Sequence, residues 1–409
     1  MLVCQTRHMP SDRSDLRLLT FAHLVNDLNQ GVLPVMVAFL NHHGLSLALA
    51  ATLTLAANLL GSIIQPLFGY LSDKRTTPWV IPAAVVVSTA GTALIGIAPS
   101  LPLMLTGAVI SGFGVAAFHP EASRFSNYFA GAKRASGMSL FTFGGYLGFA
   151  IGPLLATPLI LAFGLKGVLG LLLPAVAVAL LLVRELPHFA EVRRDAQRVR
   201  KHREGADNWG AFSIMSIVVA LRSTAFLCAL TFIAIYAVRM THAAPAFGSI
   251  ALSALLFGGA VGTLYGGRLA DRWNNRRLVI SMSLVLTMVL AAALALCGTF
   301  VGNVVPYVVL AGAFGVSLGL SAGVLVVLGQ EYLPQHIGIA SGVTLGLANT
   351  IGGIAAPAFG KIGDEYGLVM LFVAIAVSTA LAAVGSLFMP APSGADGRQL
   401  PNQLASAPR

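Results

Sequence analysis

The sequence predicts an all-α membrane protein with twelve transmembrane helices in two pseudo-symmetric six-helix bundles. Three observations predict this fold: an apolar composition, the length of the apolar stretches, and an internal repeat. Hydrophobic residues make up 56% of the 409 residues and charged residues only 10%, whereas ordinary soluble domains carry about 25% charged residues. So few charges could not cover the surface of a soluble protein of this size. A transmembrane β-barrel is excluded, because barrel strands are short segments of alternating polarity.

Twelve stretches of the sequence have the roughly 20 mostly apolar residues that a helix needs to cross a bilayer. They are expected at 17–40, 46–70, 78–99, 102–123, 135–161, 166–184, 211–237, 247–268, 278–300, 303–329, 337–360 and 367–389. The longest polar segment separates the sixth stretch from the seventh. We therefore expect an N-terminal bundle over residues 1–184, a cytoplasmic linker over 185–209, a C-terminal bundle over 210–390 and a disordered tail over 391–409.

The Lys and Arg residues lie mostly on one side of the predicted membrane. Under the twelve-span topology only Lys166, Arg239 and Lys361 fall on the opposite side, and Arg222 falls inside a span. Loops rich in Lys and Arg stay in the cytoplasm, so we expect both termini there, in a multi-pass protein of the bacterial inner membrane. The net charge of +10 then reflects this topology, and no nucleic-acid partner is expected.

The first half of the sequence is repeated in the second half. Residues 69–75 read Gly-Tyr-Leu-Ser-Asp-Lys-Arg and residues 267–272 read Gly-Arg-Leu-Ala-Asp-Arg, so both contain Gly-x-Leu-x-Asp followed by a base. A second match pairs the Ala-Ser-Gly at 135–137 with the Ala-Ser-Gly at 340–342. A duplication of six plus six spans is typical of secondary transporters, whose binding site lies between the halves near the bilayer midplane.

The repeated loop resembles the signature loop of the major facilitator superfamily of membrane transporters. A narrower resemblance links the chain to the fosmidomycin-resistance branch of that superfamily. The motifs that carry it are His-Leu-Val-Asn-Asp at 23–27, Gln-Pro at 65–66, Phe-His-Pro-Glu-Ala-Ser-Arg at 118–124 and Arg-Ser at 222–223. The resemblance implies the major facilitator fold, a monomer, and proton-coupled efflux of a small phosphonate drug.

Two further positions bear on that resemblance. Gly148 to Pro153 reads Gly-x-x-x-Gly-Pro, which is similar to part of the glycine-proline motif in the fifth span of the superfamily's antiporters. The common drug–proton antiporter motif carries an arginine in the fourth span, where this chain has Ala108. Coupling through that arginine is therefore not expected.

The first span carries a polar stripe at His23, Asn26, Asp27 and Gln30. This spacing places the four side chains on one face of a helix, and polar groups inside a span are costly and usually functional. We expect Asp27 to carry the coupling proton and His23, one turn away, to share or relay it. Asn26 and Gln30 are expected to bind substrate. The alternative is a structural hydrogen-bond cluster that joins this span to a neighbour.

The seventh span carries Arg222 near its middle. An arginine stays charged inside a membrane and needs an anionic partner. It is expected to bind an anionic substrate in a forked contact, to pair with Asp27, or to alternate between the two. The alternative is a permanent structural ion pair.

The end of the fourth span carries His119, Glu121 and Arg124, separated by Pro120. These residues are expected to form a proton path or a cytoplasmic gate, and equally a salt-bridged cap at the membrane edge. In the second span Gln65 is expected to bind substrate, although uncharged polar residues in membrane helices more often bond to neighbouring helices.

The repeated loops are expected to act as gates. The residues concerned are Asp73 and Arg75 in the first half and Asp271 and Arg272 in the second, and each aspartate lies near helix ends. A carboxylate there interacts favourably with the dipole of a neighbouring helix. Together with Arg124, these residues are expected to hold one conformation of the transporter closed.

The expected function is proton-coupled export of small polar or anionic compounds by alternating access, with a small molecule, protons and the bilayer as partners. An importer of a small metabolite or organic acid remains open, because direction depends on the relative affinities of the two states. An enzyme is not expected, since the sequence has no zinc-protease, hydrolase-elbow or Walker motif. Cys4, Cys228 and Cys297 form no ligand spacing, so no resident metal or cofactor is expected.

Overall fold

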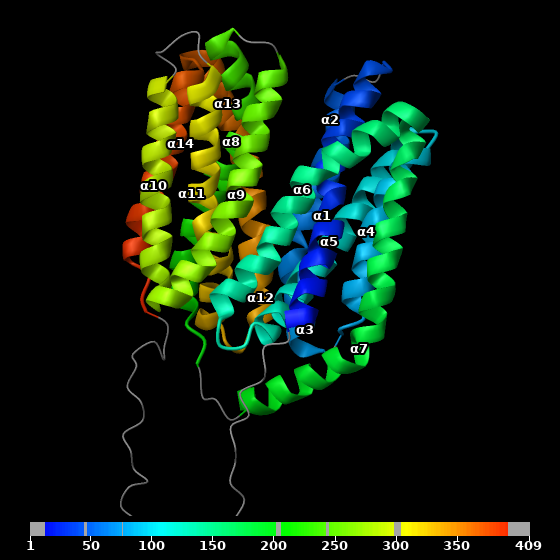
Figure 1. Cartoon of the computed structure of the whole chain (residues 1–409), viewed down its shortest axis with the longest axis vertical. Helices are drawn as coiled ribbons and strands as arrows, with labels where there is room; N and C mark the ends of the chain where they lie inside the picture. The colour runs from blue at the N-terminus through cyan, green and yellow to red at the C-terminus, as the bar shows by residue number, and fades with distance from the viewer. Residues whose placement is uncertain are drawn as a thin grey trace, which may run out of the picture.

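The structure, a computed structural model, describes residues 13–44, 47–75, 77–201, 206–242, 245–297 and 304–391. Nearly all of the expected C-terminal tail and residues 202–205 of the expected linker lie outside this range. Within it every regular element is helical (Figure 1). The first half contains α1 (Arg13–His42), α2 (Leu47–Ile63), α3 (Gln65–Lys74), α4 (Val80–Ile97), α5 (Leu101–Phe129), α6 (Arg134–Phe163), the short 3₁₀ helix η1 (Gly164–Leu171) and α7 (Leu172–Lys201). The second half contains α8 (Trp209–Thr241), α9 (Pro245–Trp273), α10 (Arg276–Cys297), α11 (Val304–Tyr332), α12 (Ile337–Gly342), the π-helical turn η2 (Val343–Leu347), α13 (Ala348–Tyr366) and α14 (Leu368–Leu387).

These helices confirm the predicted fold of twelve transmembrane helices. Two expected spans are interrupted: α2 and α3 together form the second, and α12, η2 and α13 together form the eleventh. Ten stretches of the described chain are long and apolar enough to cross a membrane, and one of them, residues 134–196, contains α6, η1 and most of α7. Helix α1 is not among the ten, and it is the span with the polar stripe.

The two bundles lie side by side and meet at one end of the molecule (Figure 1). We call this end the base; α1 begins there and α14 ends there (Figure 1). The halves contact one another through α6 with α9 and α11, and through α3 with α12. Toward the opposite end the ribbons of the two halves diverge (Figure 1).

Helix α7 continues beyond the length of a membrane span, to Lys201, so the first part of the expected linker is helical. Pro187 lies inside the helix, and a proline there removes a backbone hydrogen bond and bends the helix. The end of α7 accordingly turns and runs beneath the first bundle (Figure 1).

Candidate functional site

The polar stripe of α1 faces the interior of the first bundle. The exposed fractions of His23, Asn26 and Asp27 are 3%, 0% and 8%, while Gln30, one turn further along, is only partly buried. Helix α5 brings His119, 6% exposed, to the same place. The structure therefore joins three of the four residues expected to carry the proton, from two helices far apart in the sequence.

The ligand atoms of these three residues converge on one point. Nε2 of His23 lies 3.2 Å from Oδ2 of Asp27, and Nε2 of His119 lies 3.5 Å from Oδ1 of Asp27. The two Nε2 atoms are 3.1 Å apart. We call His23, Asp27 and His119 the triad.

The Nδ1 atoms of the two histidines, which are not directed at Asp27, determine what the Nε2 atoms of the triad are able to bind. Nδ1 of His23 lies 2.8 Å from the backbone oxygen of Phe141, and Nδ1 of His119 lies 2.8 Å from that of Val115. A carbonyl oxygen only accepts hydrogen bonds, so both Nδ1 atoms carry a hydrogen. In two neutral imidazoles both Nε2 atoms would then present lone pairs to each other. One added proton between them, balanced by the Asp27 carboxylate, makes the arrangement favourable.

Helix α6 packs closely enough on α1 to form one wall of the triad. A Cβ at Gly148 would overlap the backbone oxygen of Leu24, and one at Gly145 would lie 2.9 Å from Oδ2 of Asp27. The ring of Phe141, also on α6, stacks on His23 with centroids 4.1 Å apart. Glycines thus allow the close approach that small residues give to membrane helices.

Asn26 supports the triad from the side of α4. Its Nδ2 donates to Oδ1 of Asp27 at 3.0 Å, and its Oδ1 accepts from the Ser88 hydroxyl at 2.9 Å. Asn29 extends the network to Thr89 at 3.0 Å. In this conformation the side chain of Asn26 is fully buried. Its contacts are those of a structural hydrogen-bond cluster that joins α1 to a neighbouring helix, the alternative to substrate binding.

Arg222 lies on α8, in the second half, and is 7% exposed. Its Nε donates to the Ser321 hydroxyl at 3.0 Å, and its Nη2 donates to the backbone oxygen of Leu318 at 2.7 Å and to the Tyr146 hydroxyl at 3.3 Å. No carboxylate of the described residues lies within ion-pair distance of it. The pairing of Arg222 with Asp27 is thus absent from this conformation, in which Asp27 contacts the two histidines.

Tyr146 was not singled out by the sequence analysis. It follows Gly145 on α6 and reaches from the first half to Arg222 in the second. A tyrosine within an apolar span is a weak signal on its own. Its role emerges only when α6 and α9 pack, with Tyr146 against Gly259.

Gln65 lies at the junction of α2 and α3, where the two halves meet. Its Nε2 donates to the backbone oxygen of Gly61 at 2.6 Å, and its side chain packs against Gly346 of η2. These are helix-packing contacts. Thr350 is buried on α13, and the side chain of Asn349 lies outside the described residues.

The repeated loops form two matching contacts between the halves at the base. The Asp73 carboxylate accepts from the backbone N–H groups of Gly338, at 3.0 Å, and Ile339, at 3.1 Å, in the first turn of α12. The Asp271 carboxylate accepts from those of Ala135, at 3.2 Å, and Ser136, at 2.8 Å, in the first turn of α6. Each loop therefore caps a helix of the other half. We call these contacts the two latches.

Arg124 and Glu121 extend the first latch. The guanidinium of Arg124 bonds to the Asp73 carboxylate. Oε1 of Glu121 accepts from Nη1 of Arg193 at 2.7 Å, and Ser72 bonds to Oε2 of Glu121. Glu121 thus lies with the first latch and apart from the triad, and it is joined there by Arg193, on the extension of α7 within the expected linker.

The basic residues of the repeated loops behave differently from their aspartates. Arg75 and Arg272 are exposed at the base. The backbone oxygen of Arg75 accepts from Arg193, but neither basic side chain takes part in the latch contacts. Their expected role as gates stays a prediction.

Among the described residues the triad is the group of three His, Cys, Asp or Glu side chains whose ligand atoms converge, all within 4.8 Å of one another. No metal was expected from the spacing of the cysteines, and the three residues of the triad come from two helices and have no motif spacing of their own. Their convergence is a product of the packing of α1 on α5.

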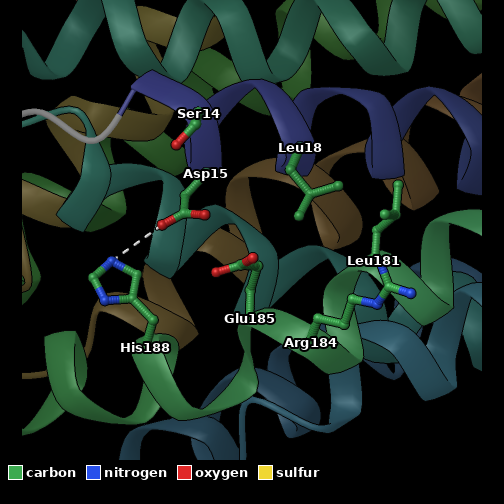
Figure 2. Close-up of a pocket in the computed structure, with 7 residues that line it drawn as sticks. All are labelled: Ser14, Asp15, Leu18, Leu181, Arg184, Glu185 and His188. Carbon is green, nitrogen blue, oxygen red and sulfur yellow. Dashed lines mark ion pairs between the residues drawn. The ribbon is translucent and has the colours of Figure 1, made fainter.

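A hollow of about 520 Å³ lies apart from the triad, at the base between α1 and α7 (Figure 2). Asp15 and His188 face each other across it, with Nε2 of His188 3.1 Å from Oδ2 of Asp15. Arg184 and Glu185 of α7 lie beside this pair (Figure 2). Within the part of the chain that the structure describes, this second His–Asp pair does not belong to a converging group of three such ligands.

Comparison with known structures shows the same fold. The fucose:proton symporter of Escherichia coli superposes with a TM-score of 0.72 at 16% identity, over 93% of this chain and 99% of that one. A second structure of that symporter, in the outward conformation, superposes with a TM-score of 0.70 at 16% identity, over 92% of this chain and 98% of that one.

Comparison with known sequences shows the family. An uncharacterized MFS-type transporter of Bacillus subtilis is 31% identical over 370 residues, 88% of this chain and 89% of that protein. The fosmidomycin resistance protein of Escherichia coli is 28% identical over 371 residues, 87% of this chain and 88% of that protein. The family model of the Major Facilitator Superfamily matches residues 19–357 and 215–408. The chain therefore belongs to the major facilitator superfamily and is a multi-pass membrane transporter rather than an enzyme.

Proposed function

We propose that this transporter exports small anionic compounds in exchange for protons, with phosphonates as the expected class of substrate. The observation that carries the proposal is the buried guanidinium of Arg222, which has no carboxylate partner among the described residues. A cation in such a place is costly unless an anion joins it. The similarity to a protein named for fosmidomycin resistance supports the same class of substrate and export as the direction.

The contacts of Arg222 leave one of its nitrogens to bind a substrate. Its Nε and Nη2 are held by Ser321, Leu318 and Tyr146, and Nη1 has no hydrogen-bond partner among the described residues. An oxyanion of a phosphonate offers the strong acceptors that a guanidinium binds best. The Tyr146 hydroxyl lies beside it as a further donor. We place the anionic group of the substrate at Arg222 and Tyr146.

We place the coupling proton on the triad. A single added proton relieves the opposition of the two Nε2 atoms and neutralises Asp27. Helix α6 connects this site with the substrate site, because Gly145 packs on Asp27 and the next residue, Tyr146, contacts Arg222. Arrival or loss of the proton would shift α6 and change the affinity of Arg222 for its anion.

The latches supply the conformational change. Both close the base, and both must break before the base opens. Rocking of the halves about the central sites then exposes them to either side in turn. We further propose a monomer in the inner membrane with the base and both termini in the cytoplasm, an orientation supported by the Lys and Arg of the loops.

The experiment that tests this function is substrate-driven proton flux in liposomes that contain the purified protein. A fosmidomycin-like phosphonate is added outside, beside unrelated drugs, and wild type is compared with Asp27→Asn. Asp15→Asn is the matched control, because it removes the buried carboxylate of a second His–Asp pair, which lies apart from the triad. We expect phosphonate-dependent proton movement that Asp27→Asn abolishes and Asp15→Asn preserves.

The sign of the proton flux separates the exporter from an importer of small organic acids. In an antiporter, external substrate moves inward and protons leave the liposome, whereas in a symporter both enter. Flux that survives Asp27→Asn would contradict the placement of the proton. No response to any phosphonate by well-folded protein would contradict the substrate class.

A further inference from the structure

We propose that the triad of His23, Asp27 and His119 is a binding site for a divalent transition-metal ion, with Zn²⁺ as the expected ion. The proposal rests on the positions of the ligand atoms and the chemistry of the donors. It depends neither on the cargo nor on the direction proposed above.

The separations of the ligand atoms match a zinc site. Ligand atoms bound at about 2.0–2.1 Å to a tetrahedral Zn²⁺ lie about 3.3–3.4 Å from one another. In the triad the two Nε2 atoms lie 3.1 Å apart. Nε2 of His23 lies 3.2 Å from Oδ2 of Asp27, and Nε2 of His119 lies 3.5 Å from Oδ1 of Asp27, so the carboxylate offers one oxygen to each imidazole. With one atom taken from each residue, the three ligand atoms lie within 4.8 Å of one another, and a rotation of the Asp27 carboxylate that brings one oxygen between the two imidazoles would complete the site.

The two imidazoles are already oriented as metal ligands. A histidine that binds a metal through one ring nitrogen almost always donates the other N–H to a carbonyl or carboxylate. Here both Nδ1 atoms bond to backbone oxygens, those of Phe141 and Val115. Both Nε2 lone pairs are thereby directed at the ion position. Asn26 fixes the third ligand by donating to Asp27.

The donor set selects the class of ion. Imidazole nitrogens suit Zn²⁺, Cu²⁺ and Ni²⁺, whereas Mg²⁺ and Ca²⁺ require oxygen ligands. Three protein ligands leave one position of a tetrahedral ion for water, as in sites where the metal exchanges ligands. The Asp27 side chain, 11% exposed compared with 4% for His23 and 7% for His119, marks the side from which that water reaches the ion.

Other histidines of the chain provide matched controls. His188 pairs with Asp15, stacks on the ring of Phe129, and has a side chain that is 40% exposed. His42 and His43 are exposed neighbours near the end of α1 opposite the base, and they are the place where an adventitious ion would bind. Both groups have imidazoles but lack the three converging ligands.

The test is titration of the purified full-length protein, without a histidine tag, with Co²⁺. Four-coordinate Co²⁺ absorbs visible light intensely, and we expect this spectrum to saturate at one ion per chain and to disappear on addition of Zn²⁺. His23→Gln and His119→Gln should each weaken binding by at least about 10–100-fold, the loss typical of even a second-shell group. His188→Gln and the double variant His42→Gln/His43→Gln should leave the spectrum unchanged.

Two outcomes would overturn the proposal. One is wild-type protein without the four-coordinate spectrum, a result that needs no variant to fold. The other is a spectrum that persists in both triad variants and disappears with His42 and His43.

A second measurement separates this proposal from the proposed function. If the triad also carries the coupling proton, Zn²⁺ should inhibit substrate-driven proton flux at the concentration at which it displaces Co²⁺. Metal binding without inhibition would support the site and contradict the role of the triad in coupling.

Discussion

The base of the molecule is nearly symmetric, and its middle is not. At the base Asp73 and Asp271 occupy equivalent places, and each caps a helix of the opposite half through two backbone N–H groups. In the middle the first half holds the carboxylate of Asp27 between two histidines, while the second half holds the guanidinium of Arg222.

This difference indicates how a duplicated chain divides its tasks. Opening and closing of the base requires equivalent contacts from both halves, so the duplicated loops keep the same residues. In the proposed function, binding of a proton and of an anion requires opposite chemistry, and the corresponding first spans of the two halves, α1 and α8, carry an acid in one and a base in the other. The comparison predicts that substitutions in the middle have large effects on substrate binding. It predicts that substitutions at the base have graded effects on how often the base opens.

The largest effect is expected for Arg222→Gln. Removal of one partner from a buried, hydrogen-bonded charge pair costs about 2–5 kcal/mol, so the dissociation constant of a phosphonate should rise about 30-fold or more. Arg222→Lys keeps the charge but loses the planar, forked set of donors. Its affinity for the phosphonate should lie between that of wild type and that of the glutamine variant.

Substrate binding to detergent-purified protein, measured by calorimetry, checks this prediction. Arg239→Gln is the control, since Arg239 lies in the last turn of the same helix, away from the middle. If Arg222→Gln binds the phosphonate with unchanged affinity, the anion site does not lie on α8, and the chemical difference between the halves does not have the proposed meaning.

The next effect concerns the two latches. Asp73 accepts hydrogen bonds from two backbone N–H groups and also from Arg124. Among the described residues, Asp271 accepts hydrogen bonds only from the two backbone N–H groups. Hydrogen bonds to charged groups contribute about 1.5–3 kcal/mol. Asp73→Asn should therefore open the base in a larger fraction of molecules than Asp271→Asn.

Distances between spin labels on the base ends of the two halves, measured in the absence of substrate, check the order of these effects. The double variant should open the base further than either single variant. Equal populations in the two single variants would show that Arg124 adds nothing to the first latch.

The sequence predicted those features that depend on local pattern. Twelve spans follow from the length of apolar stretches, and the stripe at His23 and Asp27 follows from helical spacing. The latches were expected from the repeat of Gly-x-Leu-x-Asp. In each case the sequence pattern that supports the prediction lies within about one helix or loop.

The features that escaped prediction depend on how distant elements meet. Arg193 bonds to Glu121 because α7 continues past Pro187 and runs beneath the first bundle. In the sequence this segment is only a run of charges, which is typical of a linker. Glu121 was expected beside His119 because the two are neighbours in sequence. A helix directs residues two positions apart to different faces, and the structure places His119 with the triad and Glu121 with the gate.

The smallest effect, and the most informative about coupling, is expected for Tyr146→Phe. The substitution removes a single hydroxyl, which lies 3.3 Å from Nη2 of Arg222, and such a hydrogen bond contributes about 0.5–1.5 kcal/mol. Substrate affinity should fall only about 2–10-fold. If Tyr146 transmits the state of the triad to Arg222, however, the number of protons exchanged for each substrate should fall as well. Tyr265→Phe, an exposed tyrosine on α9, is the control. A variant that binds substrate more weakly but keeps the proton ratio would confine Tyr146 to the anion site, and the two unlike halves would then communicate through the backbone contact of α6 with α1 instead.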